Sequence, residues 1–580
     1  MTKGNNTLRV VYDEWGDNRF QSKLRKIGTD NPAYTSMNMQ VYENGTLGTR
    51  PWLRLRTVGA AIPPDKLFDN EAFIAWRPIP DNALGELWVH SYNSGVFVYD
   101  FTADAWLGAG VPSGVDAQVT TSDNHGSYWG ARHGWDSSGA LVGSAMHTVL
   151  PEDNWVFGGG ARVKADDTVA AVDWGASAGG EIVNFTSYRD RLWGWQAAHN
   201  TTTQGNRLTY TNEGSYVLAG DLNYIEFGIP SGAHYIIGVW VVRDSLLVAI
   251  SDGGWWVFTG TPARGTKRFI GTYPIPAHGA VGTILNNAVY FLAPFGRQVM
   301  VATPSGVDTT SLSHVRPFNE SIPWDVFHDY RGLSSQQEQS VHLTTLRNNA
   351  DQWFAAVEVI NNNWTYTMYG KLRADAAAGN LGVLRDCAVV GQGTAYAFLM
   401  DDPDTGLSPL LKMQLYTRDI VLNRPSRSTD EWSDSKEVAA GATSTIAAKG
   451  MVKLAPFSPE GEEVRVRQVT VDYQYWSDDD SVYEDPDMRC ILLNGDNTLT
   501  ETIDTFAGGD LITLQSLGKG VDEAIGTPAR HIFRFPVEDQ QFRVTQQIQI
   551  DDILSISIDR ILVDYEIRPD NHWAGKQEGT

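Results

Sequence analysis

The residues from Ile236 to Thr259 constrain the fold more strongly than any other stretch of this sequence. Apolar side chains alternate along them up to Arg243 and Asp244, alternate again up to a turn at 251–254, and two tryptophans follow directly. A period of two residues, interrupted by short turns that contain Asp and Gly, is typical of antiparallel β-strands joined as hairpins. We therefore expect short, hairpin-connected strands here.

The same pattern recurs along the chain. Residues 188–195 repeat the Arg-Asp dipeptide with its apolar flanks, and residues 285–292 have the same form. Further strand-rich centres lie near Leu87, Trp353 and Tyr396, and from residue 188 onward the spacings run from 43 to 64 residues. Such spacings match four-stranded blades with loops of varying length. The sequence therefore predicts an all-β fold built on a divergent β-propeller of six or seven blades, with both Arg-Asp pairs in equivalent inter-strand turns.

Two other regions flank the predicted propeller. Residues 423–450 hold Pro, Ser and small residues but few large apolar ones, which is typical of a domain boundary. Clean alternation at 464–473 and 553–567 indicates the strands of a sandwich. We predict four regions: an N-terminal arm with the first strands (1–65), the β-propeller (66–425), a linker (426–450) and a C-terminal β-sandwich or jelly-roll domain (451–580).

Composition fits a large all-β protein. The chain has 580 residues, 42% of them hydrophobic, with 56 glycines and 20 tryptophans, so it can bury a sizeable core and make many tight turns. Its two cysteines, Cys387 and Cys490, fall in different predicted domains, which argues against a disulfide scaffold or a cysteine-based zinc site. No signal-peptide pattern opens the sequence and no apolar run approaches a membrane span. We expect a soluble protein made in a reducing compartment.

The formal net charge of −24 is unevenly distributed. From Asp430 to the end, 29 acidic side chains stand against 13 basic ones, whereas the first 50 residues carry a small positive excess. An acidic balance disfavours ordinary DNA binding, because each phosphate contact needs a Lys or Arg. Solubility is the simplest explanation for scattered charge, but it does not explain the concentration in one quarter of the chain.

Two short motifs and the order of the regions indicate a family. The arm carries a spaced pattern that consists of Asn38, Tyr42, Gly45, Leu47, Arg50 and Pro51. The propeller carries a second pattern that consists of Ile236, Ile237, Gly238, Arg243 and Asp244. With a β-rich end that closes on a final strand, the chain resembles the tail hub or nozzle proteins of short-tailed bacteriophages, and related β-propeller tail proteins of other phages.

That resemblance implies a structural role. Proteins of this family form a hexameric ring below the portal and adaptor, through which the genome is retained and ejected. For this chain it implies a homo-oligomer, a hexamer, that contacts the adaptor, the portal and other tail proteins. Double-stranded DNA would pass without specific binding, and no membrane would be entered. It also implies a location in the virion tail after synthesis in the host cytoplasm, and it brings no catalytic, cofactor or metal residues.

Two functions of other classes stay open. Propellers also carry glycosidases and depolymerases that act on host surface glycans, and others bind receptors at a tail tip. Residues 121–129 approach the Asp-box turn of sialidase-type blades but have one residue too many. The imidazoles of His125, His133 and His147 could bind a metal, although their spacing fits no standard site and a solvated glycine-rich loop explains them equally well. We therefore expect no enzymatic activity.

A cluster of acidic residues suggests a role in a conduit. A channel that bound phosphates would hold the genome, whereas a wall of like charge would leave DNA mobile within a screening length of about 8 Å. We hypothesise that part of this cluster faces the lumen of the ring, the alternative being that its loops face solvent on the outer rim. The cluster consists of Asp478, Asp479, Asp480, Glu484, Asp485 and Asp487.

Overall fold

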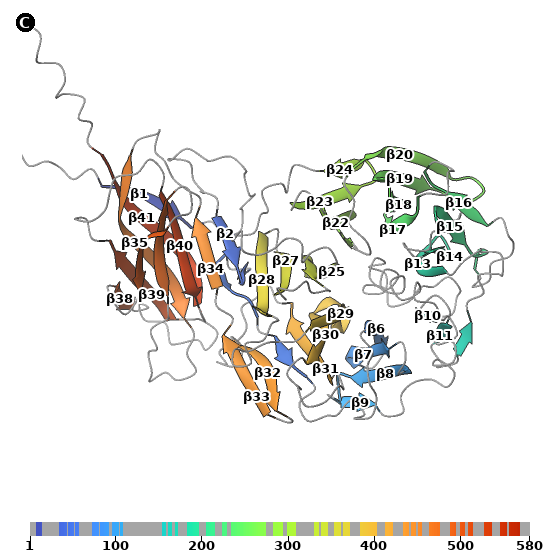
Figure 1. The fold of residues 1–580 in the computed structure, drawn as a ribbon, viewed down its shortest axis with the longest axis horizontal. Coiled ribbons are helices and arrows are strands. Elements are labelled where there is room, and N and C mark those ends of the chain that lie inside the picture. Colours follow the sequence, from blue (N-terminus) through green and yellow to red (C-terminus); the bar gives the residue numbers. More distant parts are fainter. Residues whose placement is uncertain are drawn as a thin grey trace, which may run out of the picture.

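The fold is that of a computed structural model, drawn in Figure 1. It describes residues 7–13, 15, 34–42, 45–51, 53–56, 72–79, 82–91, 95–103, 105–107, 154–157, 161–164, 169–171, 182–196, 205–214, 223–228, 234–273, 282–293, 298–308, 330–335, 338–345, 353–360, 363–371, 383–402, 412–420, 433–439, 442–447, 450–454, 463–475, 488–494, 499–504, 509–513, 527–535, 546–553 and 556–568. The expected all-β class is confirmed, since strands dominate this part of the chain.

Small antiparallel sheets follow one another through the middle of the chain, and Figure 1 shows them arranged around a common centre. We number them as blades in chain order. Blade 1 is β6 (Ala72–Ile79), β7 (Asn82–Ser91), β8 (Gly95–Asp100) and β9 (Ala105–Leu107); blade 2 is β10 (Asn154–Phe157), β11 (Ala161–Lys164) and β12 (Val169–Ala171); blade 3 is β13 (Ile182–Tyr188), β14 (Arg191–Gln196), β15 (Arg207–Tyr210) and β16 (Tyr224–Glu226).

The numbering continues through the second half of the ring. Blade 4 is β17 (Ile236–Val242), β18 (Ser245–Ile250), β19 (Gly254–Thr259) and β20 (Thr266–Thr272); blade 5 is β21 (Thr283–Leu285), β22 (Ala288–Ala293), β23 (Gln298–Thr303) and β24 (Gly306–Asp308); blade 6 is β25 (Tyr330–Ser335), β26 (Ser340–Thr345), β27 (Trp353–Ile360) and β28 (Asn363–Lys371); blade 7 is β29 (Val383–Val390), β30 (Ala395–Asp402) and β31 (Lys412–Asp419), with the short 3₁₀ turn η2 (Gly391–Gly393). Together the blades form a β-propeller.

A strand from the N-terminal arm completes blade 7. The short strand β5 (Arg54–Leu55) pairs with β31 as its outermost strand, through Leu55 opposite Tyr416. Blades 7 and 1 then share one apolar cluster, in which Trp76 and Tyr99 of blade 1 lie with Leu415 of blade 7. The arm strand β5 therefore completes blade 7, which packs against blade 1 through this cluster.

Two further sheets form what we call the C-terminal sandwich. The first sheet has the order β3 (Met39–Val41), β4 (Leu47–Thr49), β41 (Ile556–Ile567), β35 (Val464–Tyr475), β39 (Thr527–Arg534) and β38 (Gly509–Thr513), with β1 (Thr7–Tyr12) also paired to β41. The second has the order β2 (Tyr34–Met37), β34 (Gly450–Leu454), β40 (Gln546–Ile553), β36 (Arg489–Asn494) and β37 (Leu499–Asp504).

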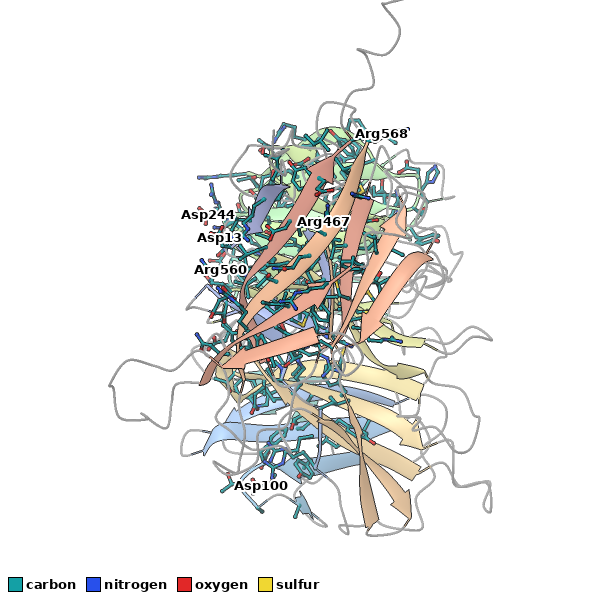
Figure 2. All side chains as sticks on the ribbon, turned by 90° about the vertical axis from the view of Figure 1, so that its left-hand side faces the viewer. Asp13, Asp100, Asp244, Arg467, Arg560 and Arg568 are labelled. Atoms are coloured by element: carbon teal, nitrogen blue, oxygen red, sulfur yellow. The ribbon has the colours of Figure 1, made fainter. Side chains whose placement is uncertain are left out.

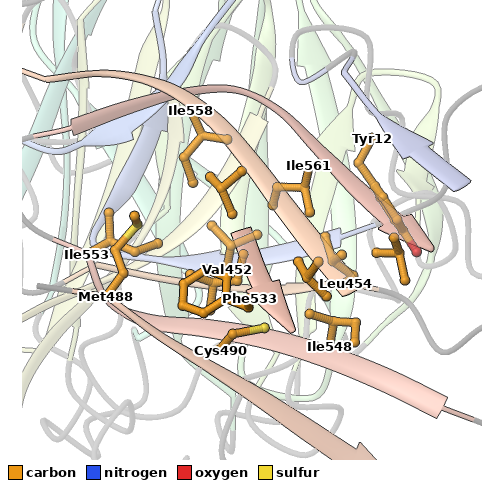
Figure 3. Packing of buried hydrophobic residues seen from close by; sticks show 14 of the residues in the cluster. Tyr12, Val452, Leu454, Met488, Cys490, Phe533, Ile548, Ile553, Ile558 and Ile561 are labelled. Carbon is orange, nitrogen blue, oxygen red and sulfur yellow. The ribbon is translucent and has the colours of Figure 1, made fainter. Parts of the chain in front are cut away.

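One buried core joins these two sheets. Phe533 and Ile558 of the first sheet meet Val452 and Cys490 of the second, as Figure 3 shows. Tyr12 of the arm strand β1 belongs to the same core, and its burial raises the pKa of its hydroxyl. The arm is therefore part of the sandwich as well as of blade 7.

The predicted turns at the two Arg-Asp pairs and the predicted linker at 426–450 can both be compared with the structure. The turns at Arg189-Asp190 and Arg243-Asp244 join the first and second strands of blades 3 and 4, as predicted, with φ of 50°, 55° and 55° at Arg189, Asp190 and Arg243. By contrast, the segment 426–450, predicted as a linker, contains the hairpin β32 (Ser433–Ala439) and β33 (Ala442–Ala447). Cross-strand backbone bonds hold such a hairpin whether or not its side chains are large.

Candidate functional site at the arm junction

Most residues singled out for chemistry lie outside the described part of the chain. This holds for all six carboxylates of the predicted lumen-facing cluster and for His125, His133 and His147. Among the described residues, no group of three or more His, Cys, Asp or Glu side chains is placed to hold a metal ion. Within the same residues, no helix is long and apolar enough to cross a membrane. What the structure does place is the pair of sequence motifs.

The arm motif forms a tight hairpin between β3 and β4. Gly45 sits in the turn with φ of +79°, a conformation that costs a glycine little. The turn is closed by Gly45 N–H, which donates to the carbonyl of Tyr42 at 2.9 Å. The Tyr42 hydroxyl donates to the carbonyl of Thr49 at 2.5 Å, and Leu47 is fully buried in the sandwich core. Each of these residues therefore has a structural task within the arm.

Asn38 and Arg50 tie the two ends of this hairpin together. Arg50 N–H donates to the Asn38 carbonyl at 2.9 Å, while its Nε donates to Asn38 Oδ1 at 3.2 Å. Its Nη1 donates to the carbonyl of Pro51 at 2.9 Å. Asn38 takes a φ of 56°, a left-handed conformation that asparagine tolerates better than most residues. Arg50 has no exposed surface, so its charge is held inside the protein.

That buried charge lies close to a second polar group, between blades 6 and 7. Arg418 of β31 forms an ion pair with Glu358 of β27, and His342 of β26 lies 3.5 Å from the same Glu358 oxygen through its Nε2. All three side chains are at most 1% exposed. We call them the blade 6–7 charge cluster. A buried pair of this kind stabilises little by itself, but removing one partner leaves the other charge without compensation.

The environment of His342 sets its protonation. Burial, above all, lowers the pKa of this imidazole to about 4; Glu358 opposes the change, while the charges of Arg418 and Arg50 add to it. His342 is therefore neutral at physiological pH. Since the charge of Arg50 also contributes to this lowered pKa, we group the arm hairpin with the blade 6–7 charge cluster and call them the arm junction.

Strand β2 connects blade 6 to the sandwich through backbone pairing. Its residues Tyr34–Met37 pair antiparallel with Met451–Leu454 of β34, and Met37 also pairs in parallel with Tyr366 of β28. Blade 6 and one sheet of the sandwich thereby become a single nine-stranded sheet. Figure 1 shows β2 and β34 between the yellow strand β28 and β40. The propeller and the sandwich are therefore joined by strand pairing through β2.

The second motif has a packing role in blade 4. Gly238 lies under the indole of Trp240, so that a Cβ added there would approach Trp240 Cη2 to 2.4 Å. Trp240 stacks on Trp255 with ring centroids 5.7 Å apart, and its Nε1 donates to the carbonyl of Gly282 in the loop that enters blade 5. The glycine of the motif is therefore required for this indole to cover the inner strand.

Arginines neutralise much of the acidity of the sandwich sheets. Asp472 binds Arg530 through two hydrogen bonds of 2.5 and 2.8 Å, and Arg560 through one of 2.5 Å. Burial opposes the charge of Asp472, but these bonds outweigh it and hold its pKa below the usual range. Glu566 is paired in the same way with Arg465 and Arg467. Figure 2 labels Arg467 and Arg560 on the strands that face the viewer. The unpaired negative charge of the domain therefore lies outside these paired positions of the central strands.

Sequence reasoning missed the blade 6–7 charge cluster. The signal was present, since Glu358 interrupts an apolar strand run and His342 stands between Val341 and Leu343. A lone charged residue in such a run needs a partner when it is buried. The partner Arg418 lies 60 residues further along the chain from Glu358, so the pair becomes visible only in the fold.

Comparisons with known proteins give only distant matches among solved structures. No family model matches the chain, and no curated protein matches it. Similar solved structures include YCF48 bound to a D1 peptide, with 8% identity, coverage of 67% of this chain and 98% of that chain, and a TM-score of 0.34. Others are the WD40 repeats of RRP9 (10% identity, coverage 66% and 99%, TM-score 0.33) and YCF48 from Cyanidioschyzon merolae (10%, 63% and 98%, 0.34). At these identities and TM-scores, the similarity says nothing further about the fold or the function of this chain.

Proposed function

We propose that this protein is a structural component of a phage tail, a ring-forming hub or nozzle through which the genome is retained and ejected. The proposal begins with the sequence resemblance. The structure supports it because both motifs that carry the resemblance hold structural positions, at the arm junction and in blade 4. A motif that serves packing fits a part that bears load better than a site that turns over a substrate.

The observation that carries the proposal is the nine-stranded sheet through β2. Two domains joined by a flexible linker move relative to each other, which suits a substrate-binding enzyme. A joint made of backbone hydrogen bonds through β2 holds the propeller and the sandwich at one angle. A ring of several copies needs such fixed geometry, because a small change of angle in each subunit prevents closure.

The protein's partners follow from this role. The ring is a homo-oligomer, with six copies as the resemblance implies, that contacts the adaptor, the portal and other tail proteins in the virion. DNA passes through it without specific binding. The lumen-facing placement of the carboxylates from Asp478 to Asp487 stays a prediction, since these residues lie outside the described part of the chain.

Electron microscopy of the purified chain tests the proposal directly. We expect closed rings with a central hole in negative stain, together with a mass near six times 64.0 kDa by mass photometry. Incubation with linear duplex DNA at physiological salt should give no stable complex. A chain that stays monomeric at all concentrations and salt conditions would contradict the proposal.

A second measurement addresses the enzymatic alternative. Purified protein should release no reducing sugar from capsule or cell-wall polysaccharide, and His125→Ala should behave like the unaltered chain. Robust turnover that Asp123→Ala or His125→Ala abolishes would instead establish a propeller glycosidase.

A further inference from the structure

Strand β20, the outermost strand of blade 4, is unusually exposed. Four consecutive residues from its start, Thr266 to Phe269, are solvent-exposed, whereas a strand normally buries every second side chain. Among the described strands, none pairs with its outer edge. Phe269 is 48% exposed, more than any other large hydrophobic residue that the structure describes. The strand therefore presents unpaired backbone groups together with an apolar side chain.

This edge is also basic in an acidic protein. Arg264, Lys267 and Arg268 lie on it or in the turn before it, and all three are exposed. No acidic residue occurs anywhere between Asp252 and Asp308, although the chain has 69 of them. Blade 4 therefore presents a positive edge to which an acidic partner would be attracted.

Contacts with blade 3 and within blade 4 hold this edge in shape. The Lys267 ammonium lies 5.6 Å from the ring centroid of Phe227 and 5.3 Å from that of Trp256, and it donates to the Glu226 carbonyl at 2.6 Å. The Phe269 ring packs on Trp256 with centroids 5.1 Å apart. Charges on an edge strand often serve to repel other strands. A half-exposed phenylalanine works against that purpose, so the edge is better suited to binding.

The sandwich contains an edge of opposite charge. Its second sheet ends at β37, whose sequence LTETID carries Glu501 and Asp504 and no basic residue. The surrounding residues 476–513 contain ten acidic residues and one arginine, Arg489, which is bound to Asp551. Since arginines neutralise the central strands of the sandwich, this segment accounts for much of the remaining negative charge.

A single chain cannot bring the two edges together. Figure 1 shows β20 and the sandwich in opposite halves of the molecule along its longest axis. A contact between them therefore requires two copies. It joins different surfaces of each copy, and repeated contacts of this heterologous type close into a ring when the rotation allows it.

We propose that β20 of one copy pairs edge to edge with β37 of the next copy. Main-chain hydrogen bonds would supply affinity, while the basic and acidic side chains would fix the partner and its orientation. The inference rests on the proposed ring, and names the surfaces that build it. The proposed contact is between two copies of this chain.

Charge reversal on each edge tests the pairing. We expect Arg264→Glu with Arg268→Glu to weaken assembly at least tenfold, measured as the concentration for half assembly by sedimentation velocity. Glu501→Lys with Asp504→Lys should weaken it similarly. All four changes in one chain should restore assembly to within about threefold of the unaltered protein, because opposite charges again face each other.

Two control variants separate this contact from general charge effects. Asp13→Lys with Asp419→Lys changes the net charge by the same amount as the β37 variant at two exposed carboxylates outside both edges, and should leave assembly within threefold. Arg243→Glu reverses an exposed arginine of the same blade, and should do likewise. Unchanged circular dichroism and melting temperature would show that each variant is folded.

Cysteine trapping gives a result that does not depend on charge. Oxidation of a mixture of Thr266→Cys and Thr502→Cys proteins should yield a covalent dimer, while either protein alone should not; the native Cys387 and Cys490 are buried and contribute little background. The pairing would be overturned if rings still form normally in the β20 and β37 charge variants and the two cysteine variants give no covalent dimer. That result would leave the proposed function intact. A monomeric chain under all conditions would overturn both.

Discussion

The hydroxyl of Tyr188 in blade 3 donates a 2.5 Å hydrogen bond to the backbone carbonyl of Asp244 in blade 4. The same hydroxyl accepts hydrogen bonds from Arg189 Nε at 3.0 Å and from Gly260 N–H at 3.2 Å. Equivalent turns of neighbouring blades are therefore joined through one side chain. The arrangement holds the two blades in register at that face of the propeller.

Removing this hydroxyl should weaken the boundary between the two blades. We expect Tyr188→Phe to lower the free energy of unfolding by about 1 kcal/mol, the usual net value of a hydrogen bond. Chemical denaturation followed by tryptophan fluorescence measures it. Tyr210→Phe is the matched control, since the Tyr210 ring packs on Trp193 with centroids 4.9 Å apart and should lose less. Equal losses in the two variants would show that the hydroxyl of Tyr188 has no special role.

Breaking the blade 6–7 charge cluster on one side should be costly. Arg418→Met leaves the carboxylate of Glu358 buried without its cation, and we expect a loss of about 3–5 kcal/mol in the free energy of unfolding. Glu358→Gln combined with Arg418→Met removes both charges, and should recover a large part of that loss. Equilibrium denaturation of the single and double variants measures the difference. If the double variant is as unstable as Arg418→Met, the ion pair is not the cause.

The lowered pKa of His342 predicts a pH dependence of stability. The folded pKa is about 4 and the ordinary value is 6.5, so between these values the unfolded chain binds a proton that the folded chain does not. The contribution is fully present above pH 6.5, and is lost as the pH falls towards 4. It amounts to on the order of 3 kcal/mol. Stability curves from pH 7 to pH 4 measure it.

His342→Gln provides the comparison for that pH dependence. Other carboxylates also titrate as the pH falls, but they are shared by both proteins and cancel in the difference. We expect the stability of the variant to fall less steeply between pH 6.5 and pH 4. Parallel curves for the two proteins would mean that His342 does not titrate as described.

Gly238 should tolerate no side chain. Gly238→Ala would place a Cβ 2.4 Å from Trp240 Cη2, so the indole must move from its stacked position on Trp255. We expect a loss of about 1–3 kcal/mol from overpacking and a changed near-ultraviolet circular dichroism spectrum. Gly306→Ala is the control, because its nearest contact is Tyr273 Oη at 3.8 Å. An unchanged spectrum for Gly238→Ala would contradict the packing described.

Features set by neighbours in the sequence could be predicted from the sequence. The alternation in 236–259 and the polar dipeptides at 189–190 and 243–244 identify hairpins, because turn geometry and period depend on adjacent residues. The pairing of β5 could not be predicted. Its two residues are too few to show a period, and their partners Tyr416 and Thr417 are set by the closure of the propeller.

The candidate site was predicted unevenly for the same reason. The residues of the arm motif were identified because their spacing is local, but nothing in that spacing placed Arg50 near His342. The partner strands of the arm begin hundreds of residues later, so their contacts depend on tertiary packing. Likewise, the basic residues of β20 can be read from the sequence, whereas the exposure of its edge depends on how the blade packs.

The position of the arm also determines when the protein can finish folding. Strand β1 pairs with β41, and β5 pairs with β31, so both arm strands await partners that lie several hundred residues further along the chain. At roughly 5–20 residues per second, the arm remains without its partners for on the order of half a minute to two minutes. During that time, a nascent arm can complete a neighbouring molecule instead of its own. Crowding of nascent chains on one messenger therefore favours exchange of this segment between copies.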